Sequence, residues 1–127
     1  MRIPPDILAA VFDHASGEYP IEACGVLAGT DVPSAWWSLR NAARSSRRYT
    51  LYPREQLDVW AAIDAAGLDP LVVVHSHPFG RPEPSTTDIA EAPPVPTLHL
   101  IVGMGDGTPT ARLWRIEDGQ ATEEPIT

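Results

Sequence analysis

Apolar residues recur at helical spacing in two stretches of the chain, residues 4–17 and 54–66. Paired prolines, Pro4 and Pro5, open the first stretch and it ends near Gly17, while Gly67 ends the second. Each stretch is therefore predicted to form an amphipathic helix. The positions that carry the spacing are Ile7, Leu8, Val11 and Phe12 in the first, and Leu57, Trp60, Ala61 and Ile63 in the second.

Shorter apolar runs predict the strands of one sheet. Residues 71–75 (LVVVH) are continuously apolar up to the histidine, which indicates a central strand buried on both faces. Residues 22–29 and 34–41 predict a hairpin, residues 49–52 an extended segment, and a short helix is expected from Ser85. Strands are also predicted at residues 98–102, 111–116 and 120–126. Helices that alternate with strands in this way indicate an α/β or α+β fold with a mixed sheet, in one domain over residues 1–127.

Composition narrows the class of protein. The chain has 127 residues, 43% of them hydrophobic, which is enough for one core without disulfides, and Cys24 is the only cysteine. The net charge of −8 argues against nucleic acid as a partner. No apolar run approaches the roughly 20 residues that cross a membrane, and an acid follows the N-terminus closely, unlike a secretory signal. We therefore expect a cytoplasmic protein with no membrane partner.

Two histidines at the end of the predicted central strand point to a metal site. His75 and His77 are separated by one residue, so on an extended segment their side chains face the same side. Asp88 lies in the first turn of the helix that follows, and a loop that turns back would bring its carboxylate to the same point. Two imidazoles and one carboxylate leave a tetrahedral position open, which is the arrangement of a catalytic zinc site.

Simpler interpretations exist for the same residues. Ser85 followed three residues later by Asp88 is also the pattern of a helix N-cap, and Ser76 can serve to shape the turn. His14 is expected at the surface of the first helix, and His99 is expected to be a hydrogen-bonded structural residue. Cys24 is expected to be a buried thiol.

Seven residues, 78–84, separate His77 of the motif His75-Ser76-His77-Pro78 from the motif Ser85-Thr86-Thr87-Asp88. This pattern resembles the signature of the JAB1/MPN/Mov34 (JAMM) metalloproteases, with Glu22 at the place of the family's upstream glutamate. The resemblance covers nearly the whole chain. It implies a three-layer, cytidine-deaminase-like α/β fold and one zinc ion held by His75, His77 and Asp88. Deaminase chemistry itself is disfavoured, because those enzymes need further cysteine ligands.

The same resemblance implies roles and a substrate. Glu22 would be the general base that passes a proton from water to the leaving amine, and Ser85 would donate a hydrogen bond to the oxyanion. The chain looks most like the bacterial subgroup that releases cysteine from a ubiquitin-like sulfur-carrier protein. The carrier tail, which ends in glycine-glycine, would then bind in extended form along a sheet edge or groove.

Three alternatives stay open from the sequence. A related JAMM enzyme could trim a carrier for the synthesis of a sulfur-containing natural product. A non-catalytic MPN scaffold would need no metal ligands, although all of them are present here. A RadC-like DNA-associated domain shares a similar His-x-His-Pro loop, but the negative charge argues against DNA binding.

Overall fold

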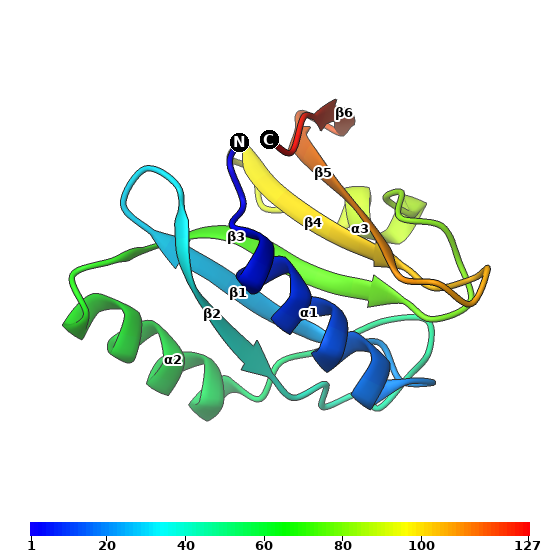
Figure 1. Cartoon of the computed structure of the whole chain (residues 1–127), viewed down its shortest axis with the longest axis horizontal. Helices are drawn as coiled ribbons and strands as arrows, with labels where there is room; N and C mark the ends of the chain where they lie inside the picture. The colour runs from blue at the N-terminus through cyan, green and yellow to red at the C-terminus, as the bar shows by residue number, and fades with distance from the viewer.

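A single six-stranded sheet organises the chain, in the order β2-β1-β3-β4-β5-β6 (Figure 1). The computed structural model describes all residues from Met1 to Thr127. The strands are β1 (Cys24–Gly29), β2 (Pro33–Leu39), β3 (Asp69–His77), β4 (Thr97–Gly103), β5 (Thr110–Glu117) and β6 (Gln120–Glu124), and the helices are α1 (Pro5–Glu18), α2 (Pro53–Ala65) and α3 (Thr86–Ala90). β3 and β4 are parallel and every other pair is antiparallel, so the sheet is mixed, as predicted.

Helix α1 covers one face of this sheet and builds the main core. Its buried side chains, Ile7, Val11 and Ala15, belong to one cluster with alternate residues of the central strands, such as Val72 and Val74 of β3. The alternation follows from the two-residue period of a strand, because residues 72 and 74 face the same side. The hydrophobic periodicity of the N-terminal segment thus determines where α1 packs.

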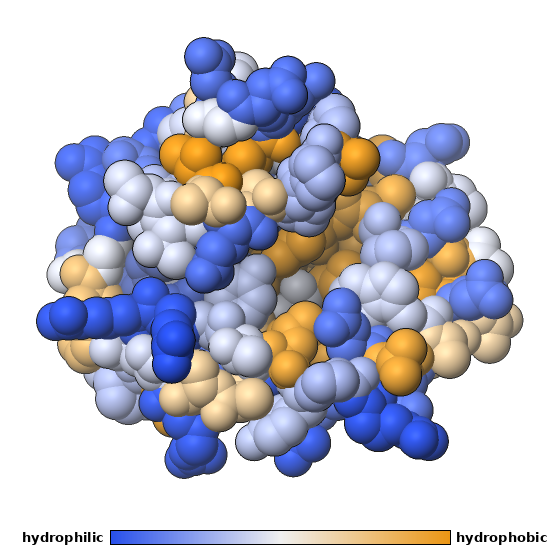
Figure 2. All heavy atoms as spheres, turned by 180° about the vertical axis from the view of Figure 1, so that it is seen from behind, coloured by the Kyte–Doolittle hydropathy of each residue, from blue (hydrophilic) through white to orange (hydrophobic).

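The opposite face carries α2 and α3 and has a much smaller core. Ile63 of α2 packs there with Val26 and Ala28 of β1, and Trp60 contacts the same cluster. Figure 2 shows this face with hydrophobic residues gathered in a central hollow. One face of the sheet is therefore fully packed, while the other is left partly open.

Most of the predicted elements are confirmed, with differences at their ends. Strand β1 begins at Cys24, so Glu22 lies before the strand and not inside it as predicted. Strand β3 runs on to His77, two residues beyond the predicted end. Residues 49–52 form no strand of their own and make one isolated bridge, between Leu51 and Asn41. None of the helices is long and apolar enough to cross a membrane.

The isolated histidines and the cysteine can also be placed. The prediction of a surface position for His14 is wrong in part, because its ring is half-buried and meets Trp36 edge-on, with 5.8 Å between centroids. His99 is buried and its Nε2 lies 2.8 Å from the hydroxyl of Thr97, which confirms a hydrogen-bonded histidine. Cys24 is a buried free thiol, as expected.

Candidate active site

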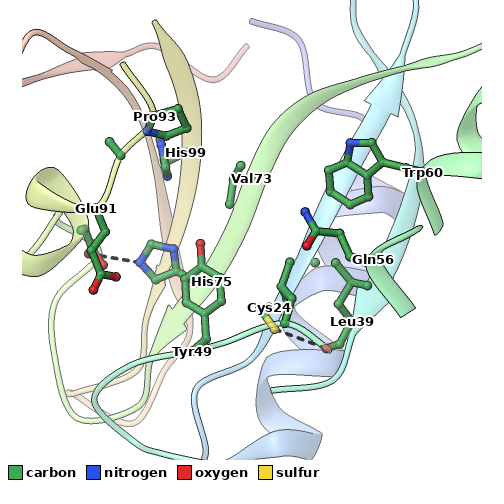
Figure 3. A pocket seen from close by; sticks show the side chains of 14 residues that line it. Cys24, Leu39, Tyr49, Gln56, Trp60, Val73, His75, Glu91, Pro93 and His99 are labelled. Carbon is green, nitrogen blue, oxygen red and sulfur yellow. Dashed lines mark hydrogen bonds and ion pairs between the residues drawn. The ribbon is translucent and has the colours of Figure 1, made fainter. Parts of the chain in front are cut away.

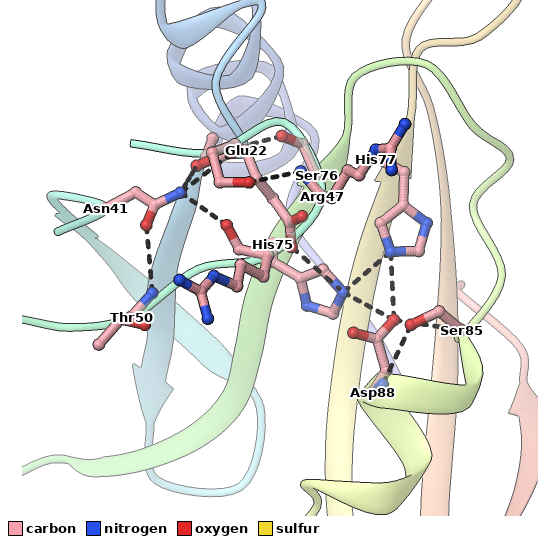
Figure 4. Close-up of polar contacts among 12 residues, drawn as sticks. Glu22, Asn41, Arg47, Thr50, His75, Ser76, His77, Ser85 and Asp88 are labelled. Atoms are coloured by element: carbon pink, nitrogen blue, oxygen red, sulfur yellow. Dashed lines mark hydrogen bonds and ion pairs between the residues drawn. The ribbon is translucent and has the colours of Figure 1, made fainter. Parts of the chain in front are cut away.

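The end of β3 brings His75 and His77 together with Asp88 of α3. The Nε2 atoms of the two histidines are 3.2 Å apart. Oδ2 of Asp88 lies 3.2 Å from Nε2 of His75 and 3.1 Å from Nε2 of His77 (Figure 4). Three donor atoms from two elements thus form a nearly equilateral triangle.

The loop between β3 and α3 is fixed against the neighbouring strands. The indole N–H of Trp114 in β5 donates to the carbonyl of Pro82 at 2.9 Å. Gly103 at the end of β4 lets the loop approach closely, since a Cβ there would lie 2.4 Å from the backbone nitrogen of Pro82. This packing, and not the proline content alone, is what returns the chain to Asp88.

A capping box holds Asp88 at the start of α3. The hydroxyl oxygen of Ser85 accepts a hydrogen bond from the N–H of Asp88 at 3.0 Å, and Oδ2 of Asp88 accepts from the N–H of Ser85 at 2.9 Å. The structural interpretation of this pair is therefore confirmed, and it coexists with the position of Asp88 beside the two histidines. The hydroxyl of Ser85 uses its oxygen in the cap, so its proton stays available to another acceptor.

Glu22 reaches the same cluster from the segment before β1. Its side chain is only 2% exposed, and Oε1 lies 4.0 Å from Nε2 of His75. The backbone around it is tied to β3, because the hydroxyl of Ser76 accepts from the N–H of Ala23 at 2.8 Å. Asn41 donates to the carbonyl of Glu22 at 3.0 Å. The carboxylate is thus positioned by bonds between distant parts of the chain.

Burial and the neighbouring charges shift the titration of these groups. Burial raises the pKa of Glu22 to about 8, and Asp88 adds to the rise while His77 opposes it. Burial also lowers the pKa of His75 below its ordinary value. Burial opposes the charged forms of Asp88 and His77 as well, but their mutual hydrogen bond is among the contacts that outweigh it, so the pKa of Asp88 is held well below its usual range and that of His77 is raised.

The ring of His77 is held in one orientation by a backbone contact. Its Nδ1 lies 2.9 Å from the carbonyl oxygen of Arg81. A carbonyl can only accept, so this contact keeps a proton on Nδ1. In the neutral ring the lone pair of Nε2 then faces Asp88 and His75, and in the protonated ring Nε2 donates to Asp88. The ring of Tyr49 stacks on His75, with centroids 5.2 Å apart.

Two pockets meet at this cluster. The first, here named the sheet pocket, has a volume of about 360 Å³ and lies on the sheet between α2 and α3 (Figure 3). Its walls include Gln56 and Trp60 on one side and His75, Asp88 and Glu91 on the other. The second, the loop pocket, has a volume of about 500 Å³, and it is lined by Glu22, Ser46, Arg47, His77, Phe79, Gly80 and Ser85.

Two groups of donors are available to a metal ion. Oxygen and nitrogen atoms of Glu22, His75 and His77 lie within 4.8 Å of one another. The group of His75, His77 and Asp88 is tighter, with separations of 3.1 to 3.2 Å. Tetrahedral bonds of about 2.0 to 2.1 Å would set ligand atoms about 3.3 Å apart, so this second group fits a zinc ion and leaves Glu22 further out.

Sequence reasoning missed two residues that hold the site in shape and gave Ser76 only a turn-shaping role. Asn41 is buried and its side chain bonds to the backbone near both ends of residues 42–50, accepting from Ala43 and Thr50 at 3.0 and 3.1 Å. Tyr49 covers one face of His75. Asn41 was the last residue of the predicted strand 34–41, where asparagine is a common turn signal, but nothing in the sequence connected it to Glu22.

A mixed sheet whose central strand ends in two histidines beside a helix-borne aspartate is the arrangement of a JAB/MPN-type hydrolase. Residues 4–117 match the Prok-JAB family, described as prokaryotic homologs of the JAB domain, and the chain belongs to that family.

Known proteins support the same assignment. The chain is 39% identical to a CysO-cysteine peptidase of Mycobacterium tuberculosis over 98% of its own length and 88% of that protein. It is 38% identical to a desampylase of Haloferax volcanii, over 85% of this chain and 80% of that one. A JAB1/MPN domain protein of Archaeoglobus fulgidus has the same fold, with a TM-score of 0.62, 19% identity, and coverage of 99% and 98%. The chain is thus a peptidase of the JAMM type, which sets aside the non-catalytic scaffold and the RadC-like domain as its primary role.

Proposed function

We propose that this enzyme is a zinc-dependent peptidase that hydrolyses the amide bond after the C-terminal glycine of a ubiquitin-like sulfur-carrier protein. The product would be a shortened carrier and free cysteine or a short peptide. The observation that carries the proposal is the triangle of donors of His75, His77 and Asp88, with Glu22 beside it, at the junction of two pockets. The names of two relatives, a CysO-cysteine peptidase and a desampylase, support a small ubiquitin-like protein as the substrate class.

His75, His77 and Asp88 would hold the zinc ion, since their donor spacing fits it. When bound, zinc supplies Lewis acidity and lowers the pKa of water to about 7. The neutral state of buried His75 and the ionised state of Asp88 leave both ready to act as ligands near neutral pH. The backbone carbonyl of Arg81 would keep His77 in the tautomer that a ligand requires.

Glu22 would be the general base and acid of the reaction. It would take a proton from the attacking water and deliver it to the nitrogen of the breaking amide, which leaves poorly unless it is protonated. Burial raises the pKa of Glu22 to about 8, within about one unit of neutral pH, and a carboxyl group tuned in this way can both accept and return a proton. Its distance of 4.0 Å from His75, longer than the spacing of the three ligands, suits a group beside the metal.

Ser85 would stabilise the oxyanion that forms when the carbonyl becomes tetrahedral. Its hydroxyl oxygen already caps α3, which fixes the side chain, and its proton remains free to be donated into the loop pocket. A donor that is held in place before the reaction stabilises developing charge without reorganising.

The sheet pocket is the better of the two pockets for the carrier tail. It is a groove between α2 and α3 that ends at His75 and Asp88, and its floor contains the small residues Cys24 and Gly25 (Figure 3). A glycine-glycine tail has no side chains to accommodate, so a narrow groove admits it and excludes bulkier sequences. Burial raises the pKa of Cys24 to about 12, so this thiol would form part of the wall and would not act as a nucleophile.

Metal content and cleavage together test the proposal. Protein purified without chelator should contain about one zinc ion per chain by plasma mass spectrometry. His77→Ala should lose the metal, while His14→Gln, a histidine on the other side of the sheet, should keep it. Mass spectrometry of a carrier–cysteine adduct should then show loss of one cysteine with the wild type alone. Absence of zinc after loading, or an unchanged adduct with loaded enzyme, would contradict the proposal.

Release of a ubiquitin-like modifier from a lysine side chain is a second candidate, favoured by the similarity to a desampylase. The bond that breaks has the same glycine carbonyl, but the leaving group is the ε-amine of a lysine. The two candidates therefore differ only in what occupies the leaving-group side of the metal.

A further inference from the structure

The loop of residues 42–50 forms one wall of the loop pocket and carries an unusual concentration of positive charge. Five consecutive positions of this loop, 44–48, contain three of the nine basic residues of the chain, with no acid between them. These residues are Arg44, Arg47 and Arg48. The protein as a whole has a net charge of −8, so this segment stands out against its surroundings.

Arg47 is the arginine of this loop that lines the pocket, together with Glu22, His77 and Ser85. Arg40, Arg54, Arg81, Arg112 and Arg115 are each paired with a carboxylate elsewhere in the structure. Arg47 makes no such pair, and its side chain is exposed. Its guanidinium is therefore free to bind a carboxylate that enters the pocket.

The backbone around Arg47 is held firmly although its side chain is free. The N–H of Arg47 donates to the hydroxyl of Ser45 at 3.1 Å, and Asn41 donates to the carbonyls of Ser45 and Arg48 at 3.3 and 3.0 Å. The carbonyl of Ser45 also accepts from the N–H of Glu22 at 2.8 Å. The position of Arg47 is thus tied to that of the proposed general base (Figure 4).

The chemistry of the leaving group shows what such an arginine could recognise. When an amino acid is released from a glycine carbonyl, its own α-carboxylate carbon lies only about 2.5 Å from the nitrogen that Glu22 would protonate. A residue that binds this carboxylate must therefore line the same pocket as Glu22, as Arg47 does. A lysine ε-amine has no carboxylate at this distance, because its own lies beyond the four methylene groups and Cα of the residue.

We propose that Arg47 binds the free α-carboxylate of the residue that is released, so that the enzyme prefers carriers extended by one C-terminal amino acid over carriers joined to lysine side chains. This inference rests on the proposed function and specifies the leaving group. The reaction remains a simple hydrolysis. The glycine carbonyl gains the oxygen of water, the C–N bond breaks, and the nitrogen gains the proton that Glu22 delivers. Arg47 takes no proton and determines specificity.

A synthetic peptide that ends in Gly-Gly-Cys provides the test. It is made once with a free C-terminal carboxylate and once as the carboxamide, and a third peptide joins the Gly-Gly end to the ε-amine of a capped lysine. The zinc-loaded wild type should cleave the acid with kcat/KM about tenfold above that of the amide or the lysine conjugate, the effect of one exposed charged hydrogen bond.

The Arg47→Gln variant should lose this preference through a higher KM for the acid, with cleavage of the amide unchanged. Arg47→Lys should keep part of the preference, because it retains the charge without the two-pronged geometry. Arg48→Gln is the matched control, since it removes the same charge from the same loop outside the pocket lining, and it should behave as the wild type. Equal cleavage of acid and amide by the wild type would overturn the proposal. An equal loss of kcat/KM on both peptides in Arg47→Gln would also overturn it, because it would indicate that Arg47 acts through Glu22.

Binding separates this proposal from the proposed function. In the inactive Glu22→Gln background, calorimetry should show about tenfold tighter binding of the acid than of the amide, and the added Arg47→Gln change should abolish the difference. If the wild type cleaves neither peptide nor a carrier adduct but this binding difference is present, the proposed hydrolysis fails and the carboxylate site stands. If binding is equal, the carboxylate site is overturned whatever the cleavage assay shows.

Discussion

The two faces of strand β3 have opposite properties, although their residues alternate along a single strand. Val72 and Val74 face α1, where they are 1% and 2% exposed and belong to the main core. Val73 and His75 face the other way and line the sheet pocket. One set of positions holds the sheet together, and the other contributes to the candidate site. The comparison suggests that a rigid face is what lets two histidines and a carboxylate stay close together across a partly open surface.

Glu22→Gln should have the largest effect on catalysis. It should change the site on the pocket-lining face of the sheet and leave the core under α1 intact. We expect turnover of a carrier adduct to fall on the order of 1,000-fold, because an amide cannot act as general base. Zinc content should be unchanged, since Glu22 lies outside the tight group of donors. The melting temperature should not fall, because the change removes a buried carboxyl group whose ionisation burial already disfavours. Loss of zinc in this variant would show that Glu22 is a ligand, as the wider donor group allows.

Ser85→Ala should have a smaller effect on the same face. Removal of one oxyanion donor is expected to lower kcat about 100-fold. The loss of the helix cap should also cost about 1 kcal/mol in stability, because the N–H of Asp88 loses its acceptor. Ser85→Asp supplies a control, since aspartate also caps helices but offers no proton to an oxyanion at neutral pH. If Ser85→Asp regains the lost stability and the turnover together, Ser85 acts only as a cap.

The sequence predicts a residue of this site well when that residue is positioned by contacts with its neighbours in the chain, and poorly when it is positioned by contacts with distant segments. His75, His77, Ser85 and Asp88 come from local patterns, namely the two-residue period of a strand and a capping box, and the structure places all four as expected. The position of Glu22 depends on a hydrogen bond between Ser76 and Ala23, which are 53 residues apart in the chain. No local sequence pattern indicates this contact. Only the family resemblance identified this glutamate.

The loop of residues 42–50 shows the limit of sequence patterns most clearly. It has no hydrophobic period, so it was predicted only as an extended segment near Tyr49, and Arg47 and Asn41 were given no role. Its shape depends on the side chain of Asn41, which bonds to backbone groups of Ser45, Arg48 and Thr50 within the loop. The sheet itself was predictable because apolar alternation repeats in each strand, whereas strand order and the parallel β3–β4 pair depend on contacts between distant segments.

Two valine substitutions compare the faces directly. Val74→Ala should lower the free energy of unfolding by about 2 kcal/mol, because it leaves a cavity in the packed core. Its kcat should stay near that of the wild type. Val73→Ala, at the neighbouring position, should cost less stability and raise KM for the carrier tail, because Val73 is only half-buried and lines the sheet pocket. Thermal unfolding and steady-state kinetics on the same preparations would check this. If kcat falls with Val74→Ala as much as KM rises with Val73→Ala, the two faces are not separate in function.

The pH dependence of zinc binding should show the smallest effect and tests the open face without any catalysis. A histidine must lose its proton before it binds a metal, so protons compete with zinc for His77. Hydrogen bonds that the His77 ring donates to Asp88 and to the Arg81 carbonyl outweigh burial and raise the pKa of His77 above its ordinary value of about 6.5. Zinc affinity should therefore be constant at alkaline pH. On acidification it should begin to fall while the pH is still above 6.5, and then fall by up to about tenfold for each further pH unit. His75 adds no step near neutrality, because burial lowers its pKa.

The His99→Gln variant is the control for this pH dependence, since His99 lies outside the donor triangle and its replacement should leave the curve unchanged. A curve that stays flat down to pH 5 would mean that His77 is not a ligand.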